Sequence, residues 1–102
     1  MGEKSVHIRD AAREIHATAV EKGFWNPGEI TFGERLMLVV TEASEAMQAY
    51  KKKQDDEIPE ELADIVIRVL DMAEGYGYDI EAAIAAKMQK NKARPYKHNG
   101  RL

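Results

Sequence analysis

Two pairs of acidic residues carry the strongest chemical signal in the sequence. The pairs are Glu42/Glu45 and Glu61/Asp64, and the two acids of each pair are three residues apart. Residues with this spacing lie on the same face of a helix. Two helices folded back on each other across the charged segment between the pairs would bring the four carboxylates together. We therefore expect the stretch 41–64 to be the chemical centre of the protein.

Four partly buried carboxylates repel one another and cannot all stay ionised without cations between them. Hard divalent cations with oxygen ligands, Mg²⁺ above all, meet this need. Apolar or small residues flank Glu42 and Glu45 in their helical stripe, which favours a metal site. The alternative is a solvated helix face, where acids at this spacing are common. A di-iron site needs Glu-x-x-His pairs, and no histidine here has a glutamate three residues earlier.

Four helices are predicted to position these acids. Apolar residues recur at steps of three and four over residues 5–22, 33–53, 59–74 and 79–92. Ser5 and Asp79 suit the N-terminal caps of the first and fourth helices. Gly23 suits the end of the first helix, and Pro59 the first turn of the third. With no convincing strand, the short connections indicate an all-α antiparallel bundle of about four helices.

The length and composition suit one soluble domain, residues 1–102. The 102 residues are 44% hydrophobic and 32% charged, which is ordinary for a globular protein. No cysteine is present, which excludes disulfides and thiolate metal sites and fits a reducing compartment. The charged beginning is not a signal peptide, and the longest apolar run, Leu36 to Val40, is too short to span a membrane. We expect a cytoplasmic protein with no membrane partner.

The charge is unevenly distributed along the chain. Six cations and no acid lie between residues 87 and 102, so the first 86 residues carry −9 against a net charge of −3. A basic tail, about residues 93–102, behind an acidic body suits either a nucleic-acid arm or a phosphate clamp that faces a metal site. Tyr96 is the only aromatic residue of the tail. A nucleic-acid partner is therefore disfavoured, because stacking segments interleave aromatic residues with cations.

The acid pairs also resemble the signature of a known family. Thr41-Glu42-Ala43-Ser44-Glu45, followed by Glu61-Leu62-Ala63-Asp64, is similar to the E-E-x-x-E…E-x-x-D pattern of the MazG-like, all-α nucleoside triphosphate pyrophosphohydrolases. Lys87-Met88-x-x-Asn91 and Arg94-Pro95-Tyr96 resemble the family's K-x-x-x-N pattern and its basic trailing segment. The likeness covers residues 33–100. It departs at Thr41, where many members have a glutamate, although relatives like the dCTP pyrophosphatases also lack an acid there.

The resemblance implies an activity and a set of site residues. Members hydrolyse a nucleoside triphosphate, (d)NTP, to the monophosphate and pyrophosphate with Mg²⁺, for which Mn²⁺ is a substitute, and nucleotide-pool house-cleaning is the implied role. The implied metal ligands are Glu42, Glu45, Glu61 and Asp64. Glu42 or Glu45 would act on the attacking water. The implied phosphate-binding residues are Lys87, Asn91 and Arg94, spaced i, i+4 and i+7. The resemblance further implies a homodimer or homotetramer with active sites near the subunit interfaces.

Residues outside the acid pairs have more ordinary interpretations. Trp25 either stacks on a nucleobase or plugs the end of the bundle, and the sequence does not separate these two roles. Phe24, its neighbour in the same loop, is expected to be a plug. Arg68 and Asp71 are three residues apart and are expected to pair as a salt bridge rather than bind metal.

Two other functions compete with hydrolysis. One is a non-catalytic, dimerising helical interaction module whose acids are merely solvated. The other is a nucleic-acid-binding protein that uses the basic tail. Metal titration separates the module from an enzyme, because clustered acids gain thermal stability when they bind metal. Salt-dependent binding to oligonucleotides would support the nucleic-acid-binding alternative.

Overall fold

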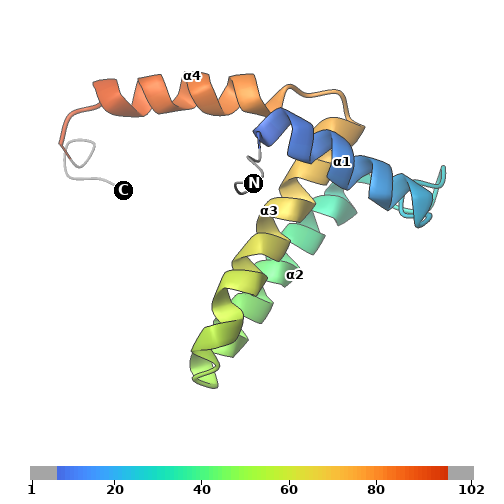
Figure 1. Cartoon of the computed structure of the whole chain (residues 1–102), viewed down its shortest axis with the longest axis horizontal. Helices are drawn as coiled ribbons and strands as arrows, with labels where there is room; N and C mark the ends of the chain where they lie inside the picture. Colours follow the sequence, from blue (N-terminus) through green and yellow to red (C-terminus); the bar gives the residue numbers. More distant parts are fainter. Residues whose placement is uncertain (1–6, 97–102) are drawn as a thin grey trace, which may run out of the picture.

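Every regular element in residues 7–96, the part of the chain that the computed structural model describes, is helical. The elements are α1 (Ile8–Glu21), α2 (Phe32–Lys51), the short 3₁₀ helix η1 (Asp55–Glu57), α3 (Ile58–Gly75) and α4 (Ile80–Ala93) (Figure 1). The prediction of an all-α fold with about four helices is therefore confirmed. Within residues 7–96, no helix is long and apolar enough to cross a membrane.

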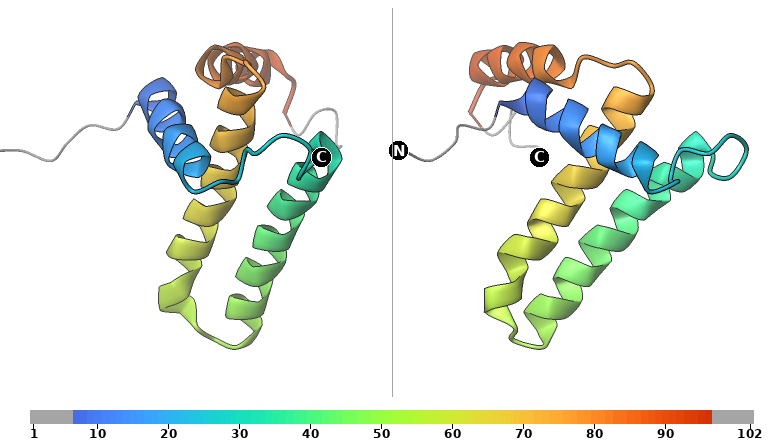
Figure 2. Two further views of the ribbon diagram at one scale, coloured as in Figure 1. Left: turned by 90° about the vertical axis from the view of Figure 1, so that its right-hand side faces the viewer. Right: turned by 45° about the vertical axis from the view of Figure 1, so that its right-hand side comes forward.

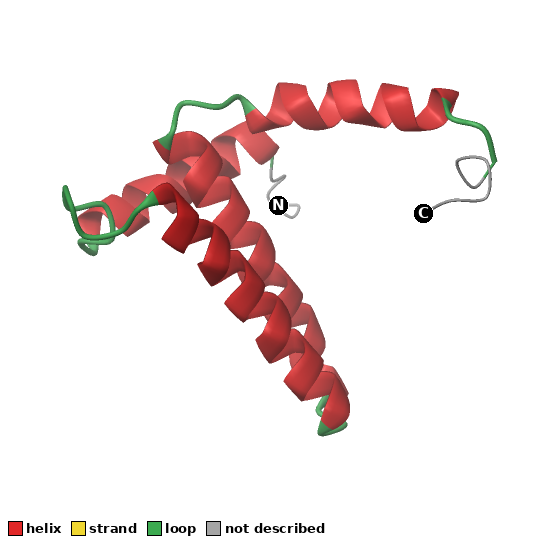
Figure 3. Ribbon diagram, turned by 180° about the vertical axis from the view of Figure 1, so that it is seen from behind, coloured by secondary structure: helices red, strands yellow, loops and turns green. Residues whose placement is uncertain are grey.

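Helices α2 and α3 form an antiparallel hairpin, and α1 crosses one end of it (Figure 2). α3 is the central element, since α1 and α2 both pack along it. The buried apolar residues are Ala12, Ala49, Leu70, Met72 and Ala73, all from these three helices. α4 has no buried residue and projects away from the hairpin (Figure 3). The molecule is thus a packed set of three helices with a fourth attached at one end.

Short polar side chains fix where two of the helices begin. The Thr31 hydroxyl accepts a hydrogen bond from the Glu34 N–H at 3.1 Å, and the Glu34 carboxylate accepts one from the Thr31 N–H at 2.9 Å. This reciprocal capping box starts α2 slightly before the predicted boundary, and the T-x-x-E spacing was a signal for it. Asp79 caps α4 as predicted. α1 begins at Ile8, and the predicted cap Ser5 lies outside the described residues.

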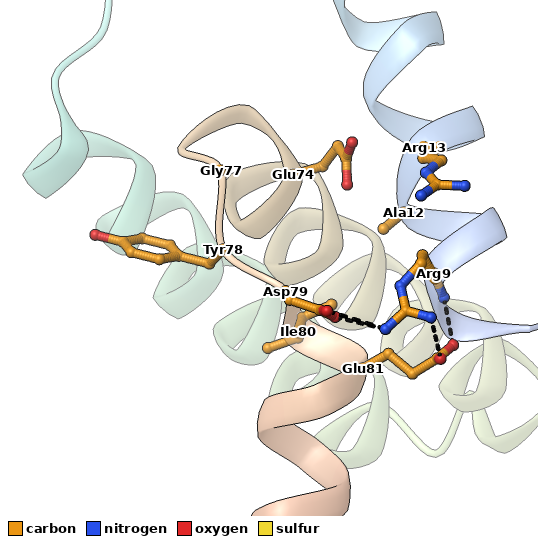
Figure 4. A pocket seen from close by; sticks show the side chains of 9 residues that line it. All are labelled: Arg9, Ala12, Arg13, Glu74, Gly77, Tyr78, Asp79, Ile80 and Glu81. Carbon is orange, nitrogen blue, oxygen red and sulfur yellow. Dashed lines mark hydrogen bonds and ion pairs between the residues drawn. The ribbon is translucent and has the colours of Figure 1, made fainter.

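One arginine of α1 fastens the start of α4 (Figure 4). Arg9 Nη2 lies 3.0 Å from the Asp79 carboxylate, and Nη1 lies 2.8 Å from the Glu81 carboxylate. The backbone N–H of Arg9 also donates to Glu81 at 3.0 Å. The N–H of Ala82, followed by the Arg9 side chain, lowers the pKa of the Asp79 carboxyl below its usual value. We call Arg9, Asp79 and Glu81 the Arg9 joint; a cavity of about 220 Å³ lies beside it.

A row of apolar side chains on α2 is left without cover. We call Leu36, Val40, Ala43, Met47 and Tyr50 the α2 stripe; they follow one another at steps of four, three, four and three. Its four large members are 44%, 56%, 54% and 66% exposed in that order. The spacing is that of a coiled-coil seam. Leu62 and Val66 of α3 are similarly exposed, at 52% and 53%. These faces are suited to burial against another surface.

Candidate metal centre

The hairpin brings three of the four predicted acids into one cluster. Glu42 and Glu45 lie one turn apart on α2, and Glu61 lies near the start of α3. One carboxylate oxygen from each of the three lies within 4.8 Å of the other two. Asp64, one turn further along α3, lines the same cavity as Glu42 and Glu45. The folded-back arrangement expected from the two spacings is thus present.

The turn between the helices makes this meeting possible. Lys53 takes a left-handed backbone conformation, with φ of 58°, directly after α2, and such a residue reverses the chain after a helix. η1 then leads into α3, where Pro59 occupies the first turn, as predicted. Glu61 therefore enters the hairpin within reach of the middle of α2.

The cluster is short of positive charge. Oε2 of Glu61 is buried and has no hydrogen-bond partner among the described residues. Desolvation, and then the charges of Glu45, Asp64 and Glu42, raise the pKa of the Glu61 carboxyl above its usual value. A buried acceptor without a donor, surrounded by other carboxylates, fits a divalent cation with oxygen ligands. This donor set, with neither sulfur nor nitrogen, suits Mg²⁺ or Mn²⁺.

Within residues 7–96, one ion pair reaches the cluster, and Arg68 makes it. Its Nε lies 3.3 Å from Oε1 of Glu42, which is 8% exposed. The predicted pairing of Arg68 with Asp71 is wrong. Asp71 instead accepts from the Trp25 indole N–H at 2.9 Å and lies 2.9 Å from Nδ1 of His16. Arg68 and Asp71 thus bind side chains of other parts of the chain rather than each other.

Of the two loop aromatics, Trp25 packs inward and Phe24 does not. Trp25 is half-buried, with Arg35 stacked on its ring at 3.5 Å and Tyr76 against it edge-on. A Cβ at Gly75 would overlap the indole, so a glycine is needed there. These contacts support the plugging role of Trp25. Phe24 is 52% exposed and lines the cavity beside the acids, so the prediction that it plugs the bundle is wrong.

Thr41, where the sequence departs from the family signature, lies apart from the cavity beside the acids. Its hydroxyl donates to the carbonyl of Met37 in the preceding turn at 3.0 Å. The residue is exposed and does not line the cavity of the acids. Thr41 therefore lies outside the acid cluster, which is built from Glu42, Glu45 and Glu61.

The predicted phosphate clamp does not meet the acids within one chain. Lys87, Asn91 and Arg94 are all exposed, and α4 carries them away from the hairpin (Figure 1). α4 ends at Ala93, so Arg94 has an extended backbone and leaves the helical face of the other two. Lys97, His98 and Gly100, which completed the resemblance, lie outside the described residues.

A cavity of about 600 Å³ lies beside the acids. Its walls come from α1, the following loop, α2 and α3, and its apolar members include Ile15, Phe24, Leu38 and Ile67. Arg35, which was not predicted as a site residue, also lines this cavity and is 6% exposed. A signal was available: positions 35, 38, 42 and 45 follow one another at steps of three, four and three.

Comparison with known proteins gives one match. A model of the MazG-like family matches residues 30–101, which include α2, α3, α4 and all four acids. No curated protein and no solved structure matches the chain.

Proposed function

Because the chain belongs to the MazG-like family, we propose that it hydrolyses a nucleoside triphosphate, (d)NTP, to the monophosphate and pyrophosphate with Mg²⁺. The observation that carries the proposal is the cluster of Glu42, Glu45 and Glu61, whose carboxylate oxygens lie within 4.8 Å of one another. The unpartnered Oε2 of Glu61 indicates that a cation belongs there. The adjoining cavity offers room for a nucleotide.

The acids of the hairpin would hold the metal, with Asp64 completing the set. Held there, Mg²⁺, or Mn²⁺ in its place, would supply charge neutralisation for a phosphate chain and would lower the pKa of a coordinated water. Glu45 is the better candidate to take the proton of the attacking water. It is exposed to the cavity, whereas Glu42 is nearly buried and already engaged by Arg68. Arg68 in turn offers cationic donors to phosphate oxygens.

The direct test is pyrophosphate release from a panel of NTPs and dNTPs with Mg²⁺. Glu45→Gln and Asp64→Asn should each lower the rate by about a hundredfold or more, with folding intact. Glu60→Gln is the matched control: it removes one carboxylate beside Glu61 that does not line the cavity, and it should keep most of the rate. Full activity in both Glu45→Gln and Asp64→Asn would refute the assignment.

We further propose that the active form is a homodimer, or a homotetramer of two such pairs, joined through the α2 stripe. The heptad spacing and the exposure of its large side chains support pairing with a second copy. Val40→Glu should convert the protein to a monomer in size-exclusion chromatography with light scattering. A dimer that survives this change would argue against the α2 stripe as the interface.

In such a pair, the exposed cations of α4 would act on the partner's acids. Within one chain α4 leads Lys87, Asn91 and Arg94 away from the hairpin, which supports an action between copies. Mixing Lys87→Ala and Glu45→Gln subunits tests this. If the clamp acts between subunits, mixed dimers contain one intact site and restore about a quarter of the wild-type activity. No recovery would place the clamp and the acids in the same subunit.

A non-catalytic dimerising module is the second candidate function. It is favoured by Thr41 in place of an acid and by the absence of α4 cations from the acid cluster in the described part of the chain. In this case Mg²⁺ would leave the melting temperature unchanged and no triphosphate would be hydrolysed.

For the enzyme, a role in clearing unwanted nucleotides would place its action in the cytoplasm, with the nucleotide pool.

A further inference from the structure

Among the residues that the structure describes, Arg35 is a buried cation without a counter-ion. It is 6% exposed, and it lines the cavity that adjoins the acid cluster. None of the ion pairs among residues 7–96 includes it. An unmatched charge is costly to bury. Packing alone therefore does not explain why a charged side chain is buried at position 35.

The contacts that Arg35 does make leave most of its donors unused. Nη2 donates to the carbonyl of Phe24 at 2.9 Å, and the guanidinium stacks on Trp25. Nε is buried and has no acceptor in the described part of the chain. A guanidinium carries five N–H donors in one plane. Two contacts therefore position Arg35, and within the described part of the chain other donors of its guanidinium have no acceptor.

Its position along α2 relates it to the acids. Arg35 lies on the same helical stripe as Glu42, seven residues earlier. At a rise of 1.5 Å per residue, the two lie about 10 Å apart along the helix axis. A nucleotide whose phosphates lie at the acids would present its base near Arg35. Two apolar residues of the cavity are near Arg35: Phe24, whose carbonyl Arg35 binds, and Leu38, one turn further along α2. Apolar side chains of this kind suit a planar base better than a phosphate chain.

We propose that Arg35 donates hydrogen bonds to a carbonyl oxygen of the nucleotide's base, and that it thereby selects bases with a carbonyl on the presented edge over adenine. Guanidinium donors match a carbonyl and an adjacent ring acceptor, whereas adenine presents an amino donor at the corresponding position. The inference rests on the proposed function for its assumption that the cavity holds a nucleotide. It adds that the base is recognised at the Arg35 end of the cavity and that the group recognised is a carbonyl oxygen of the base.

Inosine and adenosine provide a test that does not involve the metal centre. They differ at the carbonyl or amino group of the base and carry no phosphate. Trp25 is the only tryptophan and touches Arg35, so its fluorescence should report binding. Wild-type protein should bind inosine about tenfold to a hundredfold more tightly than adenosine. Arg35→Met should bring the two affinities to within about twofold, mainly by weakening inosine binding.

Two further variants separate recognition from folding. Arg35→Lys keeps the charge and an apolar stem beside Trp25, but it lacks the planar fork; it should fold and still lose most of the discrimination. Arg13→Met removes an exposed cation of α1 away from this cavity and should leave the discrimination unchanged. Circular dichroism and thermal unfolding check the fold of each variant.

The outcomes distinguish this inference from the proposed hydrolysis. It is overturned if wild-type protein binds neither nucleoside, binds both equally or prefers adenosine. It is also overturned if a folded Arg35 variant keeps the wild-type preference or loses affinity equally for both nucleosides. Preference for inosine that depends on Arg35, without Mg²⁺-dependent pyrophosphate release, would contradict the proposed hydrolysis alone.

Discussion

Two groups of charged side chains lie beside cavities of this molecule, and they differ in how well their charges are matched. In the Arg9 joint, one guanidinium meets two carboxylates at 3.0 and 2.8 Å, and the pKa of Asp79 is lowered. In the acid cluster, Glu61 has a buried oxygen without a partner in residues 7–96, and the pKa of its carboxyl is raised. Matched charges hold helices together, whereas unmatched charges are suited to an added ligand. The comparison therefore separates a structural joint from a binding site.

The largest expected effect is on the rate of hydrolysis. Glu61→Gln removes a proposed metal ligand and should lower Mg²⁺-dependent pyrophosphate release by about a hundredfold or more. The same change relieves repulsion in the metal-free protein, so its melting temperature should stay constant or rise. A variant that loses both activity and metal-free stability would show that Glu61 belongs with the structural charges, as Asp79 does.

Magnesium itself should have the next largest effect. At a concentration one hundred times its dissociation constant, a cation that binds only the folded protein stabilises it by about 2.7 kcal/mol. For a chain of this size that raises the melting temperature by roughly 10 °C or more. Glu61→Gln should abolish most of this gain, whereas Asp79→Asn should keep it. An equal gain in both variants would place the cation elsewhere.

Changes in the Arg9 joint should act on stability alone and to a smaller extent. Asp79→Ala removes both the cap of α4 and the contact with Arg9, and it should lower the melting temperature by a few degrees. Asp79→Asn keeps a capping side chain and loses only the exposed ion pair, which contributes little. Thermal unfolding by circular dichroism measures both. Equal losses in the two variants would assign the effect to the ion pair.

The smallest effect is a pH dependence of opposite sign in the two groups. Because its pKa is raised in the folded state, Glu61 favours folding below about pH 4.3, the value for a free glutamate. That contribution is lost as the pH rises through the raised pKa. Asp79, whose pKa is lowered, contributes stability above about pH 3.9, which is lost as the pH falls through the lowered pKa.

Melting curves of the metal-free protein between pH 3 and pH 8 would resolve these contributions. Glu61→Gln should remove the destabilisation that develops with rising pH. Asp79→Asn should remove part of the loss at the acid end. The first prediction fails if Glu61→Gln leaves the neutral limb of the curve unchanged.

Helical periodicity was sufficient to predict the hairpin and the meeting of the acids. The proximity of Glu42 and Glu61 depends only on the helical phase of each residue and on a short turn between the helices. Residue spacing in the sequence predicts both the phase and the turn. The partners of Arg68 could not be read in this way, because a neighbour on the same helix competes with carboxylates on other helices. Spacing places Arg35 in the stripe of Leu38, Glu42 and Glu45, but spacing alone does not show that its side chain is buried beside a cavity.

The burial of loop side chains and the direction of α4 could not be predicted from the sequence either. Trp25 and Phe24 are adjacent, and the contacts of Trp25 with Gly75, Arg35 and Tyr76, which show that it packs inward, come from distant parts of the chain. The direction of α4 is set by Arg9, a contact between residues 70 and 72 positions apart. The sequence of α4 is only weakly amphipathic, so it does not indicate which residue of α1 the helix contacts.

The separation of Arg9 from its partners also has a consequence for how the chain folds. The hairpin of α2 and α3 closes over a short turn and needs only contacts that are near in sequence, which form quickly. Arg9 cannot make its ion pairs until residues 79 and 81 have left the ribosome. We expect the hairpin to form first and the joint with α4 to close later, because its contacts are far apart in sequence.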